Sequence, residues 1–168
     1  MSLELKISFA GDEQLTRRFK GTIDAMADFR PAWHEINKKL EAFQASVFRG
    51  KGAYKGLPKW QELSENYKKR KPASVRNLIL VLTGALRRGF TQSTSEEAVR
   101  IFDKRFYVFG IDKFAVPYGE YHQTGTRRMP IRKPLRLTGI NIPGQKKGIR
   151  TDIDRIILKH IRLTERAV

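Results

Sequence analysis

Apolar side chains recur at every third or fourth position between Leu15 and Phe48. This spacing places them on one face of a helix, and such a face is buried against other elements. Pro31 interrupts the pattern, because proline lacks a backbone N–H group and breaks or restarts a helix. The pattern therefore predicts two helices or one long kinked helix, with an aromatic stripe that belongs to the core rather than to a cofactor site. The stripe consists of Leu15, Phe19, Ile23, Met26, Phe29, Trp33, Ile36, Leu40, Phe43 and Val47.

The middle of the chain carries patterns typical of β-strands. Strands are predicted at Phe90–Thr94, Ala98–Phe102 and Phe106–Ile111, and Asp103-Lys104-Arg105 joins the last two as a tight hairpin. The strand Phe106–Ile111 is apolar on both faces, so it needs cover on each side. The N-terminal helices are one cover, and a neighbouring subunit is a candidate for the other. A further strand is expected at Tyr118–Thr124.

Four other segments complete the predicted elements. Alternation of apolar and polar residues over positions 3–9 indicates a first strand. An amphipathic helix is predicted at Trp60–Lys69, and a short helix or turn at Asn77–Arg87. Apolar residues at helical spacing near the end predict a last helix, with Thr151 or Asp152 as its N-cap.

Together these elements predict a single α+β domain over residues 1–168. It consists of a mainly antiparallel sheet with the N-terminal helices and a C-terminal helix packed on it, and a basic C-terminal arm and helix from about Arg127. A hydrophobic content of 40% supports a folded chain. Because the chain has no cysteine, disulfides and thiolate metal sites are excluded. The start of the sequence lacks the features of a signal peptide, and no stretch is apolar enough for a membrane span, so we expect a protein made in the cytoplasm without membrane contact.

The chain is strongly basic. It has 34 lysines and arginines against 17 acidic residues, a net charge of +17. From Arg127 onward, 12 basic residues against three acidic ones leave +9, so about half of the imbalance lies in the last quarter of the chain. Such a field attracts polyanions without reading sequence, so acidic protein surfaces and nonspecific DNA contact are both candidates. A plainly solvated surface is the other interpretation.

Residue types that carry catalysis are sparse. The three histidines, His34, His122 and His160, lie in different predicted elements and lack metal-ligand spacing. Clustered carboxylates for a divalent ion are absent from the sequence, and so is a G-x-S-x-G elbow. The Gly- and Lys-rich loop Arg49–Lys59 does not have the P-loop spacing and is interpreted as a mobile basic linker. The sequence therefore favours a protein that is not an enzyme and has no metal or cofactor.

The segment Pro117–Thr138 combines aromatic, turn and extended-loop signals. Gly125 provides the permissive backbone that a turn needs, and Pro130 and Pro134 fix φ and favour extended neighbours. Several arginines surround the prolines, so a stiff, basic, extended arm is predicted after the strand. His122 is interpreted as a strand-end histidine hydrogen-bonded to a turn rather than as a general base.

The same segment resembles the phage virion morphogenesis family, the tail completion proteins of Mu-like phages and prophages. The similarity covers four motifs in the expected order, from Leu15 to about Thr138. They include Trp60, Leu63-Ser64 and Tyr67-Lys68; Ile79-Leu80; Thr83-Gly84-Ala85-Leu86-Arg87; and Tyr118, Tyr121-His122-Gln123, Gly125-Thr126, Met129-Pro130 and Arg132.

The resemblance implies a structural role. Members of that family complete the phage tail so that it can join the head, and the expected partners are other tail and head-tail connector proteins, with a homo-oligomeric ring in the virion. The expected location is the virion tail, after synthesis in the host cytoplasm. The residues expected to make these contacts are Tyr118, Tyr121, His122, Gln123, Gly125, Thr126, Arg127, Arg128, Pro130 and Arg132. Nucleic-acid binding by the basic C-terminal region is the alternative function.

Overall fold

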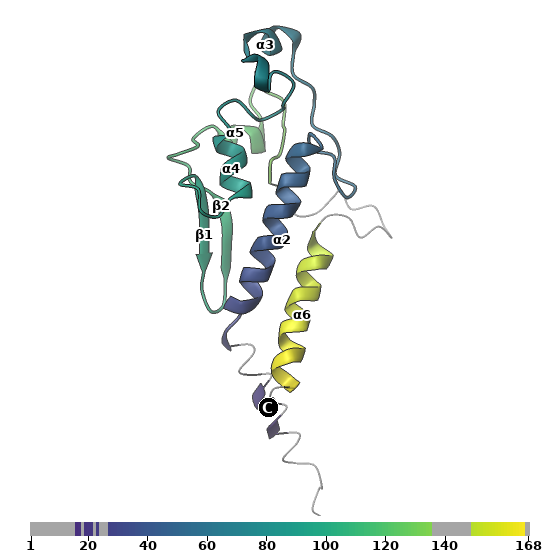
Figure 1. Ribbon diagram of the computed structural model, residues 1–168, viewed down its shortest axis with the longest axis vertical. Helices are drawn as coiled ribbons and strands as arrows, with labels where there is room; N and C mark the ends of the chain where they lie inside the picture. The colour runs from purple at the N-terminus through teal and green to yellow at the C-terminus, as the bar shows by residue number, and fades with distance from the viewer. Residues whose placement is uncertain (1–15, 18, 22, 24–26, 136–148, 167–168) are drawn as a thin grey trace, which may run out of the picture.

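The computed structural model describes residues 16–17, 19–21, 23, 27–135 and 149–166. Figure 1 shows helix α2 at the centre, with α6 along one side and the β1–β2 hairpin and α4 along the other, while α3, α5 and their loops lie around one end of α2. The elements in chain order are α2 (Arg30–Arg49), α3 (Glu65–Arg70), a 3-10 turn (Ala73–Val75), α4 (Ala85–Thr91), β1 (Ala98–Phe102), β2 (Tyr107–Ile111), α5 (Gly119–Thr124) and α6 (Arg150–Arg166).

Helix α2 confirms the apolar periodicity and the break at Pro31. It begins at Arg30 with proline in its first turn, where the missing N–H group costs no hydrogen bond. The described residues before Asp28 are helical: 16–17, 19–21, 23 and 27. Residues 28–29 are not helical, so a new helix begins at Pro31 and its neighbour Arg30. Phe19 and Ile23, predicted to be core residues, are instead exposed.

The sheet has two strands among the described residues, fewer than predicted. Strands β1 and β2 pair antiparallel from Ala98↔Ile111 to Phe102↔Tyr107, which confirms the predicted hairpin. The other two strand predictions within the described chain are wrong. Phe90 and Thr91 end helix α4, and Tyr118–Thr124 forms α5 and its N-cap instead. The strand predicted over residues 3–9 lies outside the described residues.

Both errors arose where packing overrides the strand preference of aromatic residues. Leu86 and Phe90 are four positions apart and bury one face of α4. In α5, Gly119 packs so closely that a Cβ atom would lie 2.4 Å from Ile111 Cδ1. Tyr118 and His122, also four positions apart, are then presented on a helix rather than on alternating faces of a strand.

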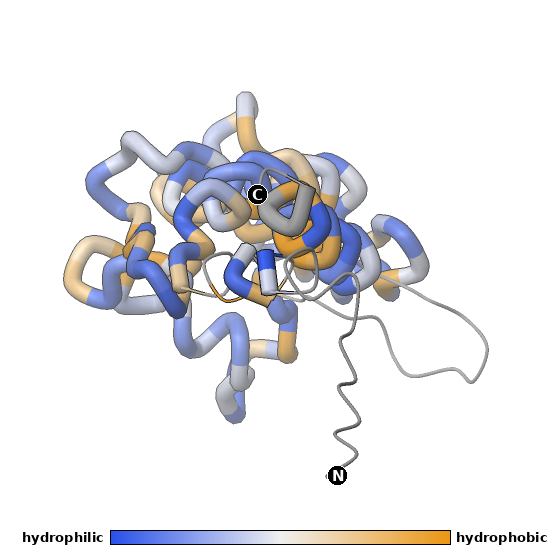
Figure 2. Tube along the Cα trace, turned by 90° about the horizontal axis from the view of Figure 1, so that it is seen from below, coloured by the Kyte–Doolittle hydropathy of each residue, from blue (hydrophilic) through white to orange (hydrophobic). Residues whose placement is uncertain are grey.

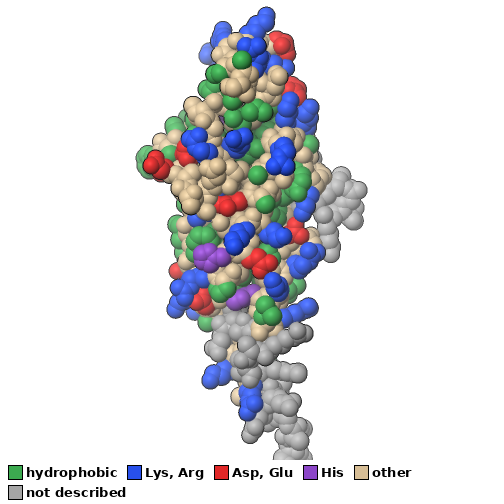
Figure 3. All heavy atoms as spheres, in the orientation of Figure 1, with side chains coloured by type: hydrophobic (Ala, Val, Ile, Leu, Met, Phe, Trp, Pro, Cys, Tyr) green, Lys and Arg blue, Asp and Glu red, His purple; other side chains and the backbone are tan. Residues whose placement is uncertain are grey.

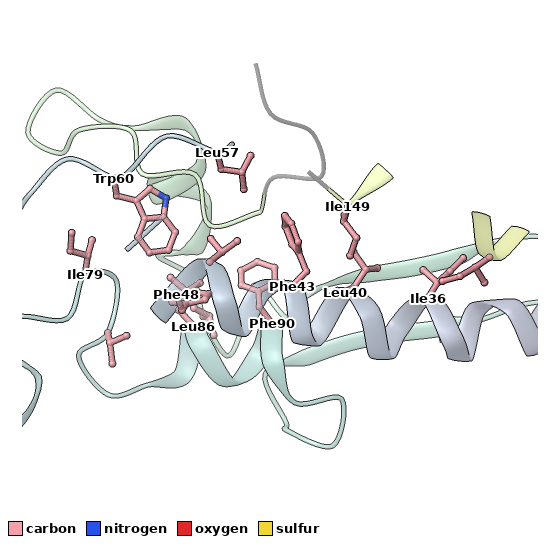
Figure 4. Close-up of a cluster of buried hydrophobic side chains, with 14 of the residues drawn as sticks. Ile36, Leu40, Phe43, Phe48, Leu57, Trp60, Ile79, Leu86, Phe90 and Ile149 are labelled. Carbon is pink, nitrogen blue, oxygen red and sulfur yellow. The ribbon is translucent and has the colours of Figure 1, made fainter. Parts of the chain in front are cut away.

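The core lies between α2 and the elements on either side. Figure 4 shows side chains from α2, α4 and the segment before α3 meeting in one cluster. Hydrophobic and hydrophilic residues alternate along the trace (Figure 2), as expected of elements with one buried and one exposed face. The buried hydrophobic residues are Ala32, Ile36, Leu40, Phe43, Val47, Phe48, Leu57, Trp60, Leu63, Ile79, Val81, Leu86, Phe90, Val116, Ile149 and Ile156.

Helix α6 is the predicted C-terminal helix, and it packs along α2. Ile156 is buried, and Lys159 Nζ lies 3.3 Å from Glu35 Oε2 of α2. His160 Nε2 lies 3.0 Å from the carbonyl oxygen of Asp28, just before α2 begins. None of the helices that the structure describes has the length and hydrophobicity that crossing a membrane requires.

Strand β2 is covered on one face by its own chain. Tyr107, Phe109 and Ile111 pack against the core. Phe106, just before the strand, and Val108 are exposed, so the second face has no cover among the described residues. The predicted cover by a neighbouring subunit stays a prediction.

Candidate pocket between the α3 loop and the 118–132 segment

A pocket lies at the end of the molecule where α3 and α5 are found. Its cavity volume is about 560 Å³, within the range of small-ligand sites. Three chain segments, 61–71, 80–84 and 118–132, form its wall. The lining residues are Gln61, Glu62, Leu63, Ser64, Tyr67, Lys71, Leu80, Val81, Leu82, Thr83, Gly84, Tyr118, His122, Arg128, Met129, Pro130 and Arg132.

Arg132 joins two of these segments. Its Nε donates a hydrogen bond to the carbonyl oxygen of Gln61 at 2.8 Å, and its Nη2 donates one to that of Glu62 at 3.0 Å. Its backbone N–H group donates to the carbonyl oxygen of His122 at 3.0 Å. The Arg132 side chain is buried, and this burial lowers its pKa. The predicted extended arm is therefore folded onto the protein here rather than projecting from it.

Three further hydrogen bonds stabilise the same region. Trp60 Nε1 donates to the carbonyl oxygen of Lys133 at 3.0 Å. Gln123 Nε2 donates to the carbonyl oxygen of Leu135, whose N–H group donates back to Gln123 Oε1 at 3.3 Å. Gln123, predicted as an interface residue, thus fixes the segment from within.

Gly125 and Thr126 shape the turn that carries Arg128 to the pocket. Gly125 has a φ of +80°, and a Cβ atom there would lie 2.6 Å from Ile131 Cγ1. Thr126 Oγ1 accepts hydrogen bonds from the N–H groups of Arg128 and Met129. The turn predicted from Gly125 is confirmed.

Lys71 contributes a buried cation to the pocket wall. It is 4% exposed, and its ammonium donates a hydrogen bond to the carbonyl oxygen of Leu78. Burial lowers the pKa of Lys71, because leaving water disfavours the charged form. Lys71 is the C-cap of α3, and the chain turns back after it, so that its side chain reaches the carbonyl of Leu78.

His122 lies in α5 with its ring half-buried at the pocket. Among the described residues its buried Nδ1 has no hydrogen-bond partner, so the predicted side-chain bond from a strand end to a turn is wrong; its backbone carbonyl accepts a hydrogen bond from the N–H group of Arg132. Burial, and then the nearby positive charge of Arg132, lower the pKa of His122 from 6.5. The described part of the chain contains no cluster of three His, Cys, Asp or Glu residues able to hold a metal ion. The arrangement suits binding, since it shows a cationic, partly apolar cavity without a nucleophile paired to a base.

Half of the ten predicted interface residues line the pocket. They are Tyr118, His122, Arg128, Pro130 and Arg132. Tyr121 and Arg127 are exposed but lie outside the lining. Sequence reasoning missed Lys71, Val81 and Leu82 as lining residues, for which the only signal was their position between the motifs, and it did not predict a contact role for Leu80 although Leu80 belongs to a motif.

Comparison of the chain with protein-family models, curated proteins and solved structures finds no match. The function is therefore argued from the pocket and from the resemblance of the sequence motifs.

Proposed function

We propose that the protein is a structural virion assembly protein of a phage or prophage, which completes the tail and prepares it for joining to the head. One observation carries this proposal: the separate motifs that resemble the tail completion family converge on one pocket. Ser64 and Tyr67 come from the first motif, Gly84 from the third, and Tyr118 and Arg132 from the last.

The convergence supports the proposal because these motifs are far apart in the chain. Arg132 bonds to the backbone of Gln61 and Glu62, next to the tryptophan that opens the first motif. A chance resemblance scattered along the sequence would not be expected to build one cavity. The segments thus act together as a single recognition surface.

The mechanism of the proposed function is binding. The pocket and the exposed residues beside it, Tyr121 and Arg127, form the contact with other tail or head-tail connector proteins. Arginine and tyrosine suit such contacts, because arginine forms bidentate pairs and tyrosine adds contact area at low entropic cost. Copies of the chain form a ring in the virion tail after synthesis in the host cytoplasm, since closed symmetry is the usual outcome of repeated self-contact.

The test is electron microscopy of an induced lysate from a strain that lacks the gene. Full heads should accumulate beside unjoined or abnormal tails, and a plasmid copy of the wild-type gene should restore joined particles. Normal numbers of joined particles in the deletion strain would contradict the proposal.

Sequence-nonspecific nucleic-acid binding is a second candidate, favoured by the net charge of +17. Lysine and arginine side chains are spread over the whole visible face rather than gathered in one patch (Figure 3). Binding of this kind would show equal affinity for unrelated DNA duplexes. The logarithm of the association constant would fall linearly with the logarithm of the salt concentration. Fluorescence anisotropy with two duplexes of different sequence measures both properties.

A further inference from the structure

The pocket has an apolar body. Six of its lining residues are aliphatic or proline, and Tyr67 and Tyr118 add partly exposed rings at its edge. Pockets of this size and lining enclose an apolar group and orient it through a few polar contacts. The six residues are Leu63, Leu80, Val81, Leu82, Met129 and Pro130.

The pocket offers three positively charged side chains besides its neutral polar ones. The ammonium of Lys71 has three donors, of which one bonds to Leu78, and it lies 6.0 Å from the centre of the Tyr67 ring. Among the described residues, the bonds of Arg132 use Nε and Nη2, which leaves Nη1 for another acceptor. Arg128 adds an exposed cation at the rim.

Negative charge does not balance these cations within the pocket. Glu62 is the one acidic residue of the lining; its carboxylate forms an ion pair with Lys59 at 3.0 Å, and its effect of raising the pKa of Arg132 is outweighed by burial, which lowers it. Burial alone accounts for the lowered pKa of Lys71, with no carboxylate contributing. A buried cation without an acidic partner is costly, and an anionic ligand would remove that cost.

The backbone at the pocket is strained at one position. Leu80 has a φ of +59°, in the left-handed region that a bulky side chain rarely adopts. Such residues persist only where their surroundings hold them, and they are enriched at ligand sites. Leu80 lies in the pocket wall.

We infer that this pocket binds the C-terminal residue of a partner protein, with an apolar side chain in the cavity and the chain-end carboxylate on Lys71 and Arg132. A chain end carries both groups on one residue, which matches the closeness of the apolar wall and the buried cations. The inference does not depend on a role in tail assembly.

Nucleic acid fits the pocket less well. A phosphate backbone is bound along a track of exposed cations with stacked aromatic rings. In this pocket Lys71 and Arg132 are 4% and 8% exposed, and they lie among aliphatic side chains. A compact carboxylate attached to an apolar group reaches them, whereas a continuous chain of phosphates does not.

Titration of ¹⁵N-labelled protein, followed by two-dimensional NMR, tests this inference with small probes. N-acetyl-phenylalanine mimics an apolar chain end and should shift the amide signals of the pocket residues. N-acetyl-phenylalaninamide has the same ring but no charge, and it should bind at least about tenfold more weakly, since it loses a charge-assisted contact. N-acetyl-aspartyl-phenylalaninamide carries its carboxylate on a side chain and should also bind more weakly than N-acetyl-phenylalanine.

Two variants and two matched controls connect the binding to the named cations. Lys71→Met should weaken N-acetyl-phenylalanine about tenfold or more, whereas Lys69→Met, at an exposed lysine, should not change it. Arg128→Met removes a rim charge without touching the buried structure, so it should weaken binding even if Lys71→Met fails to fold. Arg105→Met, at an exposed arginine of the hairpin turn, is its control.

Three results would overturn the inference. The first is equal affinity for the acid and the amide, which would make the pocket a purely apolar site. The second is stronger binding of the aspartyl probe, which would point to an internal acidic segment. The third is a ten-nucleotide single-stranded DNA that shifts the pocket signals when N-acetyl-phenylalanine does not, which would assign the pocket to nucleic acid.

Discussion

Two buried arginines show how differently the two halves of this molecule are held together. The helical body, made of α2, α4, α6 and the β1–β2 hairpin, contains Arg100, and the pocket end, residues 57–84 and 118–135, contains Arg132. Arg100 donates from Nε to Asn37 Oδ1 at 3.1 Å, from Nη1 to the carbonyl of Gly110 at 2.7 Å and from Nη2 to that of Gly89 at 2.9 Å. One side chain thus bonds to α2, β2 and α4 at once.

Around Arg100 the body supplies packing as well as hydrogen bonds. The guanidinium lies 3.9 Å from the centre of the Phe109 ring, and Glu41 Oε1 is 3.7 Å from its Nε. Tyr107 also donates its hydroxyl to Asn37 at 2.6 Å. Arg100 therefore completes a region whose apolar elements already pack together.

Arg132 lies in a region that has little helix or strand. Its two side-chain bonds go to backbone carbonyls of Gln61 and Glu62, in a segment that is neither helix nor strand. Here single side chains replace the hydrogen-bond ladders of helices and sheets. Such regions open at a lower free energy than the core does. Binding surfaces are commonly found in regions of this kind.

The largest expected effect comes from removing the arginine of the body. Arg100→Met should lower the free energy of unfolding by about 3–5 kcal/mol, because it leaves the carbonyls of Gly89 and Gly110 without this donor and Glu41 without its cation, while Asn37 keeps only the Tyr107 hydroxyl. Urea denaturation measures this change. Arg105→Met, at an exposed position, is the control and should stay within about 0.5 kcal/mol of wild type. A similarly small effect at Arg100 would mean that apolar packing alone holds the body.

Removing the arginine of the pocket end should cost less and act locally. Arg132→Met loses two charge-assisted bonds and should lower the free energy of unfolding by about 2 kcal/mol. Hydrogen exchange should rise over residues 60–71 and 122–135, while α2 keeps its protection. Arg128→Met, at an exposed position of the same turn, is the control. If protection of α2 fell equally, the two regions would be one cooperative unit and the contrast between them would not hold.

The same contrast explains what could be predicted from the sequence. In the body, periodicity reports burial directly, and it predicted α2, the hairpin and α6 because each buries one regular face. Leu40 and Phe43, three positions apart in the sequence pattern, are both 3% exposed in the core. The α+β class was confirmed for this reason, although the sheet is smaller and the fold more helical than predicted.

In the pocket end, structure depends on contacts that no local pattern encodes. The aromatic residues Tyr118 and Tyr121 favour strands, yet the segment is a helix whose Gly119 packs closely on Ile111. Lys71 ends a run of basic residues, which is typical of a solvated helix end. Its side chain is buried because the chain turns back toward Leu78. Five of the predicted contact residues line the pocket, but the pocket itself depends on bonds across some seventy positions, such as Arg132 to Gln61.

The smallest expected effect is a pH dependence confined to the pocket end. Burial and the charge of Arg132 lower the pKa of His122 below its ordinary value of 6.5, so the unfolded chain binds a proton more readily than the folded one. The contribution of His122 to stability is therefore complete above pH 6.5 and decreases as the pH falls from 6.5 through the lowered pKa. Urea denaturation from pH 7 to pH 5 should show the wild type losing stability relative to His122→Gln.

The comparison with Arg132→Met assigns this pH dependence to the pocket end. The other histidines are present in every variant, so they cancel when wild type and His122→Gln are compared. In the Arg132→Met background, the difference in pH dependence between the chains with His122 and with His122→Gln should shrink. One of the two causes of the lowered pKa of His122 is then gone, while burial remains. A difference unchanged by Arg132→Met would show that the two side chains are not coupled. Wild-type stability that rose on acidification relative to His122→Gln would contradict the lowered pKa of His122 itself.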